Sequence, residues 1–316
     1  HEHSMVADNT ISTEFLGLSF RSPIVLLSGC VGFGDEYSRI DGFSLSGVGG
    51  VFLKGTTLEP RAGNKPHRVA ETPAGMLNSI GLQNPGVEEV VNNLLPSLEP
   101  PETLYFANVS GSTIDEYAAV TEKFNNTCVS GIELNISCPN VDKGGMHFGN
   151  DPEMSARVVE ACRGVTTKPL IAKLSPNQTD IKANAERCIG AGSDGLSVVN
   201  TISGMAIDIE SQRPLLGNNA GGLSGPAIKP IALLKVREVY SVAKKYGVPI
   251  IGQGGISSSA DAIEFLLAGA SVVGVGTALF SDPLLCDKIN QGLSKYLKEH
   301  NISSIGGLVG ALKENN

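Results

Sequence analysis

Residues 249–277 read PIIGQGGISSSADAIEFLLAGASVVGVGT, and this stretch indicates how the chain folds. It begins and ends with short apolar runs that do not alternate with polar residues, which is typical of strands buried on both faces of a parallel sheet. Between the runs, Ser258 and Asp261 fit a capping box, and Gly269 is placed to end a helix. The stretch therefore predicts a strand–helix–strand unit.

Apolar runs of the same kind recur along the whole chain. We count eight predicted strands, at residues 23–27, 50–53, 104–107, 131–134, 169–172, 195–199, 249–252 and 271–275. Eight strands that alternate with helices predict a (β/α)₈ TIM barrel, with its site at the C-terminal mouth of the strands. Asp282 and Pro283 predict the start of the last helix, as a cap and a proline at the first helical position.

A doubly wound open sheet is the structural alternative to the barrel. No change of composition and no linker divides the chain, so we expect residues 1–316 to form one barrel domain. Residues 1–4, which precede Met5, have the character of an expression remnant and are left out of the fold prediction.

Charge and cysteine usage narrow the class of protein. The formal net charge of −8 disfavours a general affinity for nucleic acid or anionic membranes. The six cysteines are scattered, no cluster has metal-ligand spacing, and no secretory segment or membrane-length apolar run is present. We therefore expect a cytoplasmic protein with reduced thiols and no metal site.

Polar residues directly follow most of the predicted strands. They are Lys54, Asn108, Asn135, Lys173 and Asn200. Any one of them has an ordinary structural explanation, since asparagine often closes a strand and lysine often begins a solvated loop. At the mouth of a barrel, however, all five would converge. Two lysines among three asparagines suggest a pocket for a planar, anionic, amide-rich ligand.

Glycines mark the ends of the last two strands, at 252–256 (GQGGI) and 274–277 (GVGT). Glycine lets backbone N–H groups approach an anion, and barrels commonly bind phosphate after these two strands. Close packing of strands against helices also selects glycine, so the pattern alone is weak. A phosphate at this place fits a flavin nucleotide and a phosphosugar equally well.

Cys138 stands between two asparagines just past the fourth predicted strand, in Asn135-Ile136-Ser137-Cys138-Pro139-Asn140. A cysteine is usually a small buried hydrophobe, but this one precedes a proline that turns the chain over the barrel mouth. Its thiolate could serve as a base or a nucleophile. We expect the other five cysteines to be structural.

Residues 56–86 and 203–225 are predicted to be long loops that serve the site, and residues 141–150 are predicted to be a mobile lid.

Taken together, the motifs are similar to those of a known family. They are Ser28-Gly29-Cys30, Lys54-Gly55-Thr56-Thr57, residues 78–86 (NSIGLQNPG), residues 135–140 (NISCPN), residues 172–176 (AKLSP) and residues 221–225 (GGLSG). From Phe15 onward the chain resembles class 1 dihydroorotate dehydrogenases, and within them the class 1B catalytic subunit. Gly55, where alanine is common, and Gln253 depart from the family pattern.

The resemblance implies an activity and a set of residues. In the family reaction a base removes a proton from C5 of dihydroorotate and a hydride passes from C6 to FMN, in pyrimidine biosynthesis; the resemblance makes Cys138 the base. It implies substrate binding by Lys54, Asn78, Ser79, Ile80, Gly81, Leu82, Asn135, Asn140, Asn200 and Thr201. For FMN it implies Ser28, Lys54, Gly55, Asn108, Asn135, Lys173, Val199, Gly225, Gly254, Gly255, Gly276 and Thr277, with Lys173 beside the ring, where its charge favours the anionic reduced flavin.

The resemblance also implies partners. Class 1B enzymes have a central dimer of the FMN chain and a second subunit that carries FAD and a 2Fe–2S cluster and passes electrons to NAD⁺. No dinucleotide fingerprint or four-cysteine cluster spacing occurs in this sequence, in agreement with a separate NAD⁺-reducing subunit. A dihydropyrimidine dehydrogenase-like flavoenzyme, a phosphosugar lyase or isomerase barrel and a non-catalytic scaffold barrel are the alternatives.

Overall fold

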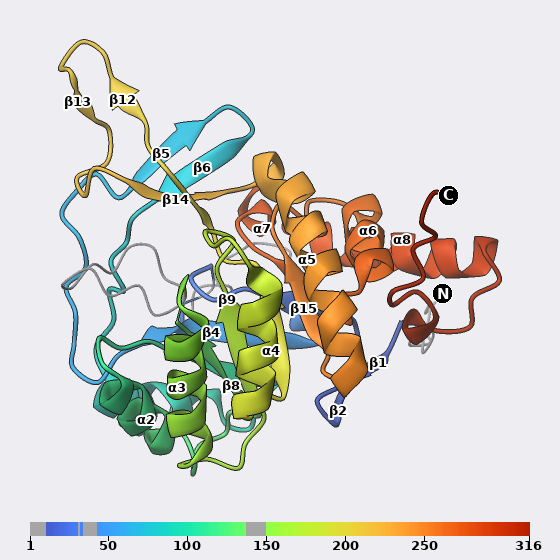
Figure 1. Cartoon of the computed structure of the whole chain (residues 1–316), viewed down its shortest axis with the longest axis horizontal. Coiled ribbons are helices and arrows are strands. Elements are labelled where there is room, and N and C mark those ends of the chain that lie inside the picture. Colours follow the sequence, from blue (N-terminus) through green and yellow to red (C-terminus); the bar gives the residue numbers. More distant parts are fainter. Residues whose placement is uncertain (1–10, 31, 34–42, 137–149) are drawn as a thin grey trace, which may run out of the picture.

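In the computed structural model, which describes residues 11–30, 32–33, 43–136 and 150–316, eight parallel strands close into a barrel (Figure 1). In spatial order the strands are β10 (Gly195–Val198), β15 (Ile250–Gln253), β16 (Val272–Val275), β3 (Ile24–Leu26), β4 (Gly50–Thr56), β7 (Leu104–Val109), β8 (Gly131–Asn135) and β9 (Leu170–Leu174). Each of the eight predicted apolar runs forms one of these strands. The TIM barrel predicted from the sequence is therefore confirmed.

Helices cover the outside of the barrel. Seven that the structure describes are α2 (Ile114–Lys123), α3 (Pro152–Arg163), α4 (Ile181–Ala191), α5 (Lys229–Ala243), α6 (Ser259–Ala268), α7 (Ala278–Ser281) and α8 (Leu285–Glu299). Before β7 the chain forms α1 (Val87–Glu89), then the short π-helix η3 (Val90–Leu94) and the 3-10 helix η4 (Leu95–Leu98). In the part of the chain that is described, none of the helices has both the length and the apolar character that crossing a membrane requires.

The predicted start of α6 is confirmed, but that of α8 is wrong. Ser258 caps α6 by accepting a hydrogen bond from the backbone N–H of Asp261, and Gly269 follows the last turn. Asp282 instead follows α7, and its carboxylate accepts the N–H of Leu284 at 3.1 Å. This local turn uses residues 282–284, so that α8 begins only at Leu285.

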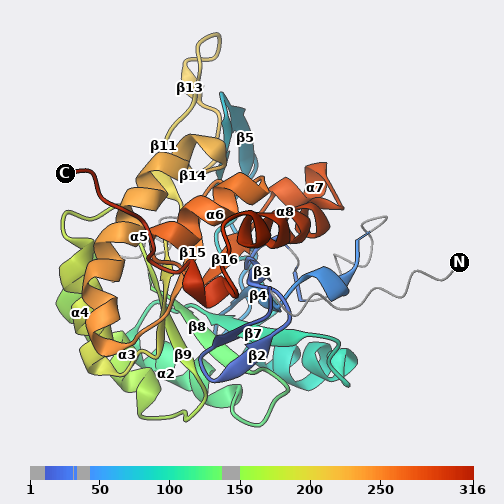
Figure 2. The same cartoon turned by 90° about the vertical axis from the view of Figure 1, so that its right-hand side faces the viewer.

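A short hairpin closes the N-terminal end of the barrel. It consists of β1 (Thr13–Phe15) and β2 (Leu18–Phe20), and it lies at the end opposite the hairpin of β12 (Ile207–Asp208) and β13 (Arg213–Pro214) (Figure 2). Phe20 and Phe106 have ring centroids 6.1 Å apart, and Phe106 stacks on Phe52 at 4.7 Å. These rings pack with Val25, Ile171, Ile251 and Val272 in a cluster separate from the main core. Side chains thus fill the half of the barrel interior that lies toward the N-terminal ends of the strands.

The two long connections predicted as loops contain strands. They supply an antiparallel four-stranded sheet of β11 (Ile202–Gly204), β14 (Gly221–Ser224), β6 (Gly75–Asn78) and β5 (Val69–Thr72), and a hairpin of β12 (Ile207–Asp208) and β13 (Arg213–Pro214). We call the four-stranded sheet the accessory sheet. Figure 1 shows the β12–β13 hairpin projecting away from helices α3 and α4. The accessory sheet pairs residues about 150 positions apart, such as Met76 with Ser224, and so ties the two connections together.

We call the cluster around Phe20, Phe52 and Phe106 the phenylalanine floor, and its packing gives a stability prediction. Phe106 is fully buried, so Phe106→Ala removes a stacked ring and leaves a cavity in the barrel interior. We expect the free energy of unfolding in urea to fall by about 3–5 kcal/mol. Phe280→Ala is the matched control, because Phe280 is 53% exposed, and should change it by less than about 0.5 kcal/mol. Equal effects of the two substitutions would contradict the packing role.

Candidate active site

Five polar residues were expected to follow strands, and four of them instead belong to the C-terminal ends of the strands. They are Lys54 in β4, Asn108 in β7, Asn135 in β8 and Lys173 in β9. The strands are longer than predicted at their C-terminal ends: Gly55 pairs with Asn108, and Asn135 pairs with Lys173. The apolar pattern misses these residues because polar groups replace the apolar ones where the barrel interior opens. Their placement at one end of the barrel is as predicted.

The barrel interior is divided into an apolar and a polar layer. Side chains alternate along a strand, so residues two apart face the same side. Phe106 and Ile171 belong to the floor, and Asn108 and Lys173, two residues further on, therefore face the interior above it. Strand β4 is irregular, since its register with β7 shifts between Phe52 and Gly55. The mouth thus has polar side chains over a hydrophobic base.

Lys54 and Lys173 give the mouth a positive charge. Lys173 is buried with 8% of its surface exposed, and Lys54 is half-buried. Neither ammonium has a carboxylate within 4.0 Å in the described ranges. A buried cation without a counter-ion is costly unless an anion or polar ligand accompanies it. The site therefore favours an anionic ligand.

Asn135 and Asn200 are bonded to each other across the barrel. The Asn200 amide nitrogen donates to Oδ1 of Asn135 at 3.0 Å, and Asn200 Oδ1 accepts the N–H of Thr201 at 2.8 Å. Tyr117, which the sequence analysis did not identify, donates its hydroxyl to the backbone carbonyl of Asn135 at 2.9 Å. Asn177, also not identified, donates to the carbonyl of Thr201 at 3.1 Å. The amides are thus held in fixed orientations.

The segment from Asn78 to Leu82 is held in place by two asparagines that the sequence analysis did not single out. Asn84 bonds with the Thr57 hydroxyl and N–H, the Leu82 carbonyl and the Gly86 N–H, at 2.7 to 3.2 Å. Asn64 donates to the hydroxyl of Ser79 at 2.8 Å. Ser79 is fully buried, whereas Asn78, Ile80, Gly81 and Leu82 are not. Of the predicted substrate residues from Asn78 to Leu82, Ser79 therefore already has a hydrogen-bond partner for its hydroxyl within the protein.

The glycines after the last two strands differ in the structural reason for having no side chain. Gly255 has a φ of 78°, and a Cβ there would lie 2.7 Å from the carbonyl oxygen of Gly225. A Cβ on Gly254 would lie 2.8 Å from Ala232 of α5, which is the close strand–helix packing considered above. A Cβ on Gly276 meets only ordinary contacts, 3.6 Å from Leu27 and 3.7 Å from Cys30. Among the described residues, neither packing nor backbone strain accounts for glycine at position 276.

The remaining residues predicted to bind a flavin lie at the same rim. The N–H of Leu27 donates to the carbonyl of Val275, so the segments that carry Ser28 and Thr277 run side by side. The backbone N–H of Val199 donates to the carbonyl of Gln253 at 3.2 Å, which joins the ends of β10 and β15. Gly225 follows β14 and faces Gly255. The barrel therefore brings these residues to its C-terminal end.

Two interior polar residues were not identified as site residues from the sequence. Glu133 is 2% exposed; its carboxylate accepts the Asn108 amide N–H at 2.7 Å and the Ser197 hydroxyl at 2.5 Å. Gln253 is 3% exposed, and its amide nitrogen donates to the carbonyl of Val199 at 3.1 Å. The signal for Glu133 was present, since an acidic residue within an otherwise buried strand is uncommon.

The described cysteines are mostly unreactive thiols. Burial raises the pKa of Cys162 to about 11 and of Cys188 and Cys286 to about 12. Burial also raises the pKa of the half-buried Cys128. These thiols stay protonated at neutral pH, in agreement with a structural role. Cys30 is the exception by position, because it lies beside Gly276 at the mouth.

Some predicted features fall on residues outside the described ranges. Cys138 and Asn140, and the predicted lid at 141–150 except Asn150, are among them. The chain leaves β8 at Asn135, so that this segment starts from the C-terminal mouth of the barrel.

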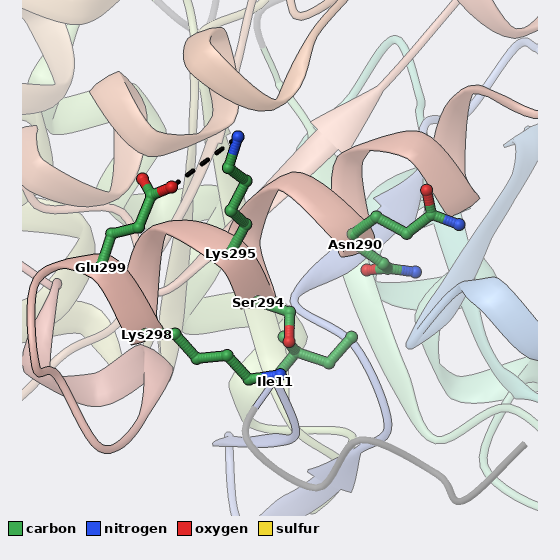
Figure 3. A pocket seen from close by; sticks show the side chains of 7 residues that line it. Ile11, Asn290, Ser294, Lys295, Lys298 and Glu299 are labelled. Atoms are coloured by element: carbon green, nitrogen blue, oxygen red, sulfur yellow. Dashed lines mark ion pairs between the residues drawn. The ribbon is translucent and has the colours of Figure 1, made fainter.

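A surface hollow lies away from the mouth, on α8. It has a volume of about 460 Å³ and is lined by Ile11, Asn290, Gln291, Ser294, Lys295, Lys298 and Glu299. Lys295 and Glu299 form an ion pair one helical turn apart (Figure 3). No residue predicted to act in binding or catalysis lines this hollow, so the mouth remains the candidate site.

Comparison with solved structures agrees with the fold. The crystal structure of DHODH in complex with ferulenol from Eimeria tenella superposes with a TM-score of 0.80, covering 98% of this chain and 90% of that one. Its sequence identity is 21%, so this likeness concerns the fold.

Sequence comparison goes further than the fold. The family model described as dihydroorotate dehydrogenase matches residues 10–297. The dihydroorotate dehydrogenase B (NAD(+)) catalytic subunit of Geotalea daltonii is 48% identical, over 98% of this chain and the whole of that protein. The protein of the same name from Geobacillus kaustophilus is 48% identical, over 96% of this chain and 95% of its own length. The chain belongs to the dihydroorotate dehydrogenase family.

Proposed function

We propose that this chain oxidises (S)-dihydroorotate to orotate in pyrimidine biosynthesis, as the catalytic subunit of an NAD⁺-linked dihydroorotate dehydrogenase. The observation that carries the proposal is the polar layer at the barrel mouth. There Lys54, Asn135, Lys173 and Asn200 offer two cations and two amides in a chain that belongs to this family. Orotate and dihydroorotate are both anions with amide edges, which these groups match.

Three features fit FMN at the same mouth. The amide oxygens of Asn108 and Gln253 are buried and have no hydrogen-bond partner among the described residues, so each offers an acceptor to a ligand donor. At Gly276 the bare backbone leaves room that a methyl group would fill. We place the ring side near Ser28, Lys54, Gly55, Asn108, Asn135, Lys173 and Val199, and the phosphate near Gly225, Gly254, Gly255, Gly276 and Thr277. When bound, FMN supplies the hydride acceptor.

The chain's own residues bind and orient the substrate. Lys54 meets the carboxylate, and the amides of Asn78, Asn135, Asn140 and Asn200 bond with the pyrimidine edge. The Asn200–Asn135 hydrogen bond fixes the orientation of both amides, so the ligand meets a preorganised pattern of donors and acceptors. Ser79 to Leu82 and Thr201 complete the enclosure. We assign Cys138, in the segment that leaves β8, to removal of the C5 proton.

The first test asks whether the protein contains a flavin that dihydroorotate reduces, and whether Cys138 is the base. Purified protein should be yellow and should lose that colour when dihydroorotate is added without oxygen; dihydrouracil should leave it unchanged. Cys138→Ala should keep the flavin but slow its reduction by about 10²- to 10⁴-fold, the usual contribution of a general base. Cys188, which is buried away from the mouth, provides the control: Cys188→Ala should leave the rate of reduction unchanged. A colourless parent protein contradicts the flavoenzyme proposal and favours a phosphosugar enzyme.

A second test concerns the phosphate. Gly276→Ala adds a methyl group that the protein itself accommodates but that would crowd an anion held by backbone N–H groups. We expect wild-type stability without FMN and an FMN affinity reduced about 10- to 100-fold, as one or two charge-assisted hydrogen bonds are lost. Gly255→Ala should instead destabilise the apoprotein, because of its positive φ and the Gly225 carbonyl. Unchanged FMN affinity in Gly276→Ala would place the phosphate elsewhere.

The electron acceptor gives a third test. We propose that a homodimer of this chain works with a subunit that carries FAD and a 2Fe–2S cluster, which agrees with the relatives' designation as catalytic subunits. The isolated chain should reduce artificial dyes with dihydroorotate and fail with NAD⁺. Addition of such a subunit should restore NAD⁺ reduction. Rapid NAD⁺ or fumarate reduction by the isolated chain would overturn this arrangement.

A further inference from the structure

Glu133 is a buried acid that the proposed reaction does not use. It lies in β8 with 2% of its surface exposed, between Asn108 of the neighbouring strand β7 and Ser197 of β10. Both contacts are with donors: the amide of Asn108 at 2.7 Å and the hydroxyl of Ser197 at 2.5 Å. The Glu133 carboxylate is therefore the acceptor in both hydrogen bonds.

The carboxylate determines which way the Asn108 amide points. If the amide were turned over, its oxygen would face the carboxylate oxygen, and two acceptors would be in contact. The nitrogen of Asn108 therefore faces Glu133, and the oxygen faces away. That oxygen is buried and has no hydrogen-bond partner in the described part of the chain. The buried carboxylate thus fixes the orientation of the amide, with its oxygen directed away from Glu133.

The free oxygen of Asn108 points toward residues proposed to bind FMN. Gly55 of β4 pairs with Asn108, and a Cβ built on Gly55 would lie 3.1 Å from this oxygen. Glu133 lies on the opposite, β8 side of Asn108. Because position 55 is glycine, no Cβ of this residue crowds the Asn108 oxygen. A buried acceptor without a partner destabilises the protein until a donor arrives.

We infer that Glu133 is a positioning residue for the flavin: it holds the Asn108 amide so that its oxygen accepts a hydrogen bond from a donor group of bound FMN. This inference rests on the proposed function, because it requires FMN at the mouth. Glu133 itself does not touch the cofactor in this account. Its effect reaches FMN through Asn108, and Ser197 steadies the carboxylate from the other side.

The experiment exchanges the donor and acceptor of the pair. Glu133→Gln keeps the shape but can donate as well as accept, so Asn108 is no longer held in one orientation. In the double variant Glu133→Gln with Asn108→Asp, the new amide donates to the new carboxylate, which still presents an oxygen toward Gly55. The double variant also keeps the net charge of the parent. FMN affinity is measured by titrating each apoprotein with FMN and following the quenching of flavin fluorescence.

We expect Glu133→Gln to weaken FMN binding by about tenfold or more, the loss of one hydrogen bond between a buried acceptor and its donor. The double variant should recover most of that affinity and the parent's flavin absorbance spectrum. Ser193→Ala is the control for simple destabilisation, since it removes a buried hydrogen bond to Gly195 elsewhere in the barrel. It should lower the melting temperature of the apoprotein and leave FMN affinity unchanged.

The possible outcomes separate this inference from the proposed function. If the parent chain binds no FMN, the proposed function fails. If the parent binds FMN and Glu133→Gln binds it within twofold of the parent, only the positioning role is overturned. The role is also overturned if Glu133→Gln weakens binding and the double variant recovers none of it, because a purely structural role for Glu133 predicts that result.

Discussion

The closed ring of parallel strands is the constraint on which the rest of this structure depends. Closure forces the inward side chains of eight strands to share one cross-section, and alternation lets each strand contribute at intervals of two residues. At one end Phe52 and Phe106 fill that space with rings stacked at 4.7 Å. At the other end Asn108 and Lys173, on the same faces of their strands, replace apolar groups with polar ones. A site is formed where the apolar packing stops.

The sequence predicts the barrel well because buried parallel strands have a strong local signal. All eight apolar runs are strands, and residues as far apart as Lys54 and Thr277 were correctly expected at one mouth. Local signals fail where distant contacts decide the structure. The accessory sheet pairs Met76 with Ser224, a partner that neither connection reveals alone. At Asp282 the side chain makes a turn with Leu284 instead of capping α8, although both arrangements use the same residue types.

The position of the candidate-site residues at one end of the barrel is predictable from the sequence, whereas their hydrogen bonding is less so. Lys173 and Asn135 can be identified from their positions at strand ends. That Asn84 makes four hydrogen bonds, and that Glu133 bonds across two strands, depends on distances that no spacing rule contains. Glycine is a similar case: Gly254, Gly255 and Gly276 look alike in the sequence. Only the structure distinguishes the first two, which packing and backbone conformation require, from the third.

The hairpin of β1 and β2 determines from which end a ligand can reach the barrel interior. Phe15 and Phe20 close the end opposite the mouth, so the barrel is a blind tube and not a channel. A ligand at the mouth is therefore reached from the C-terminal side of the barrel and not through its N-terminal end. Residues 13–20 thus restrict access to one side of the barrel, although they lie at the end opposite the candidate site.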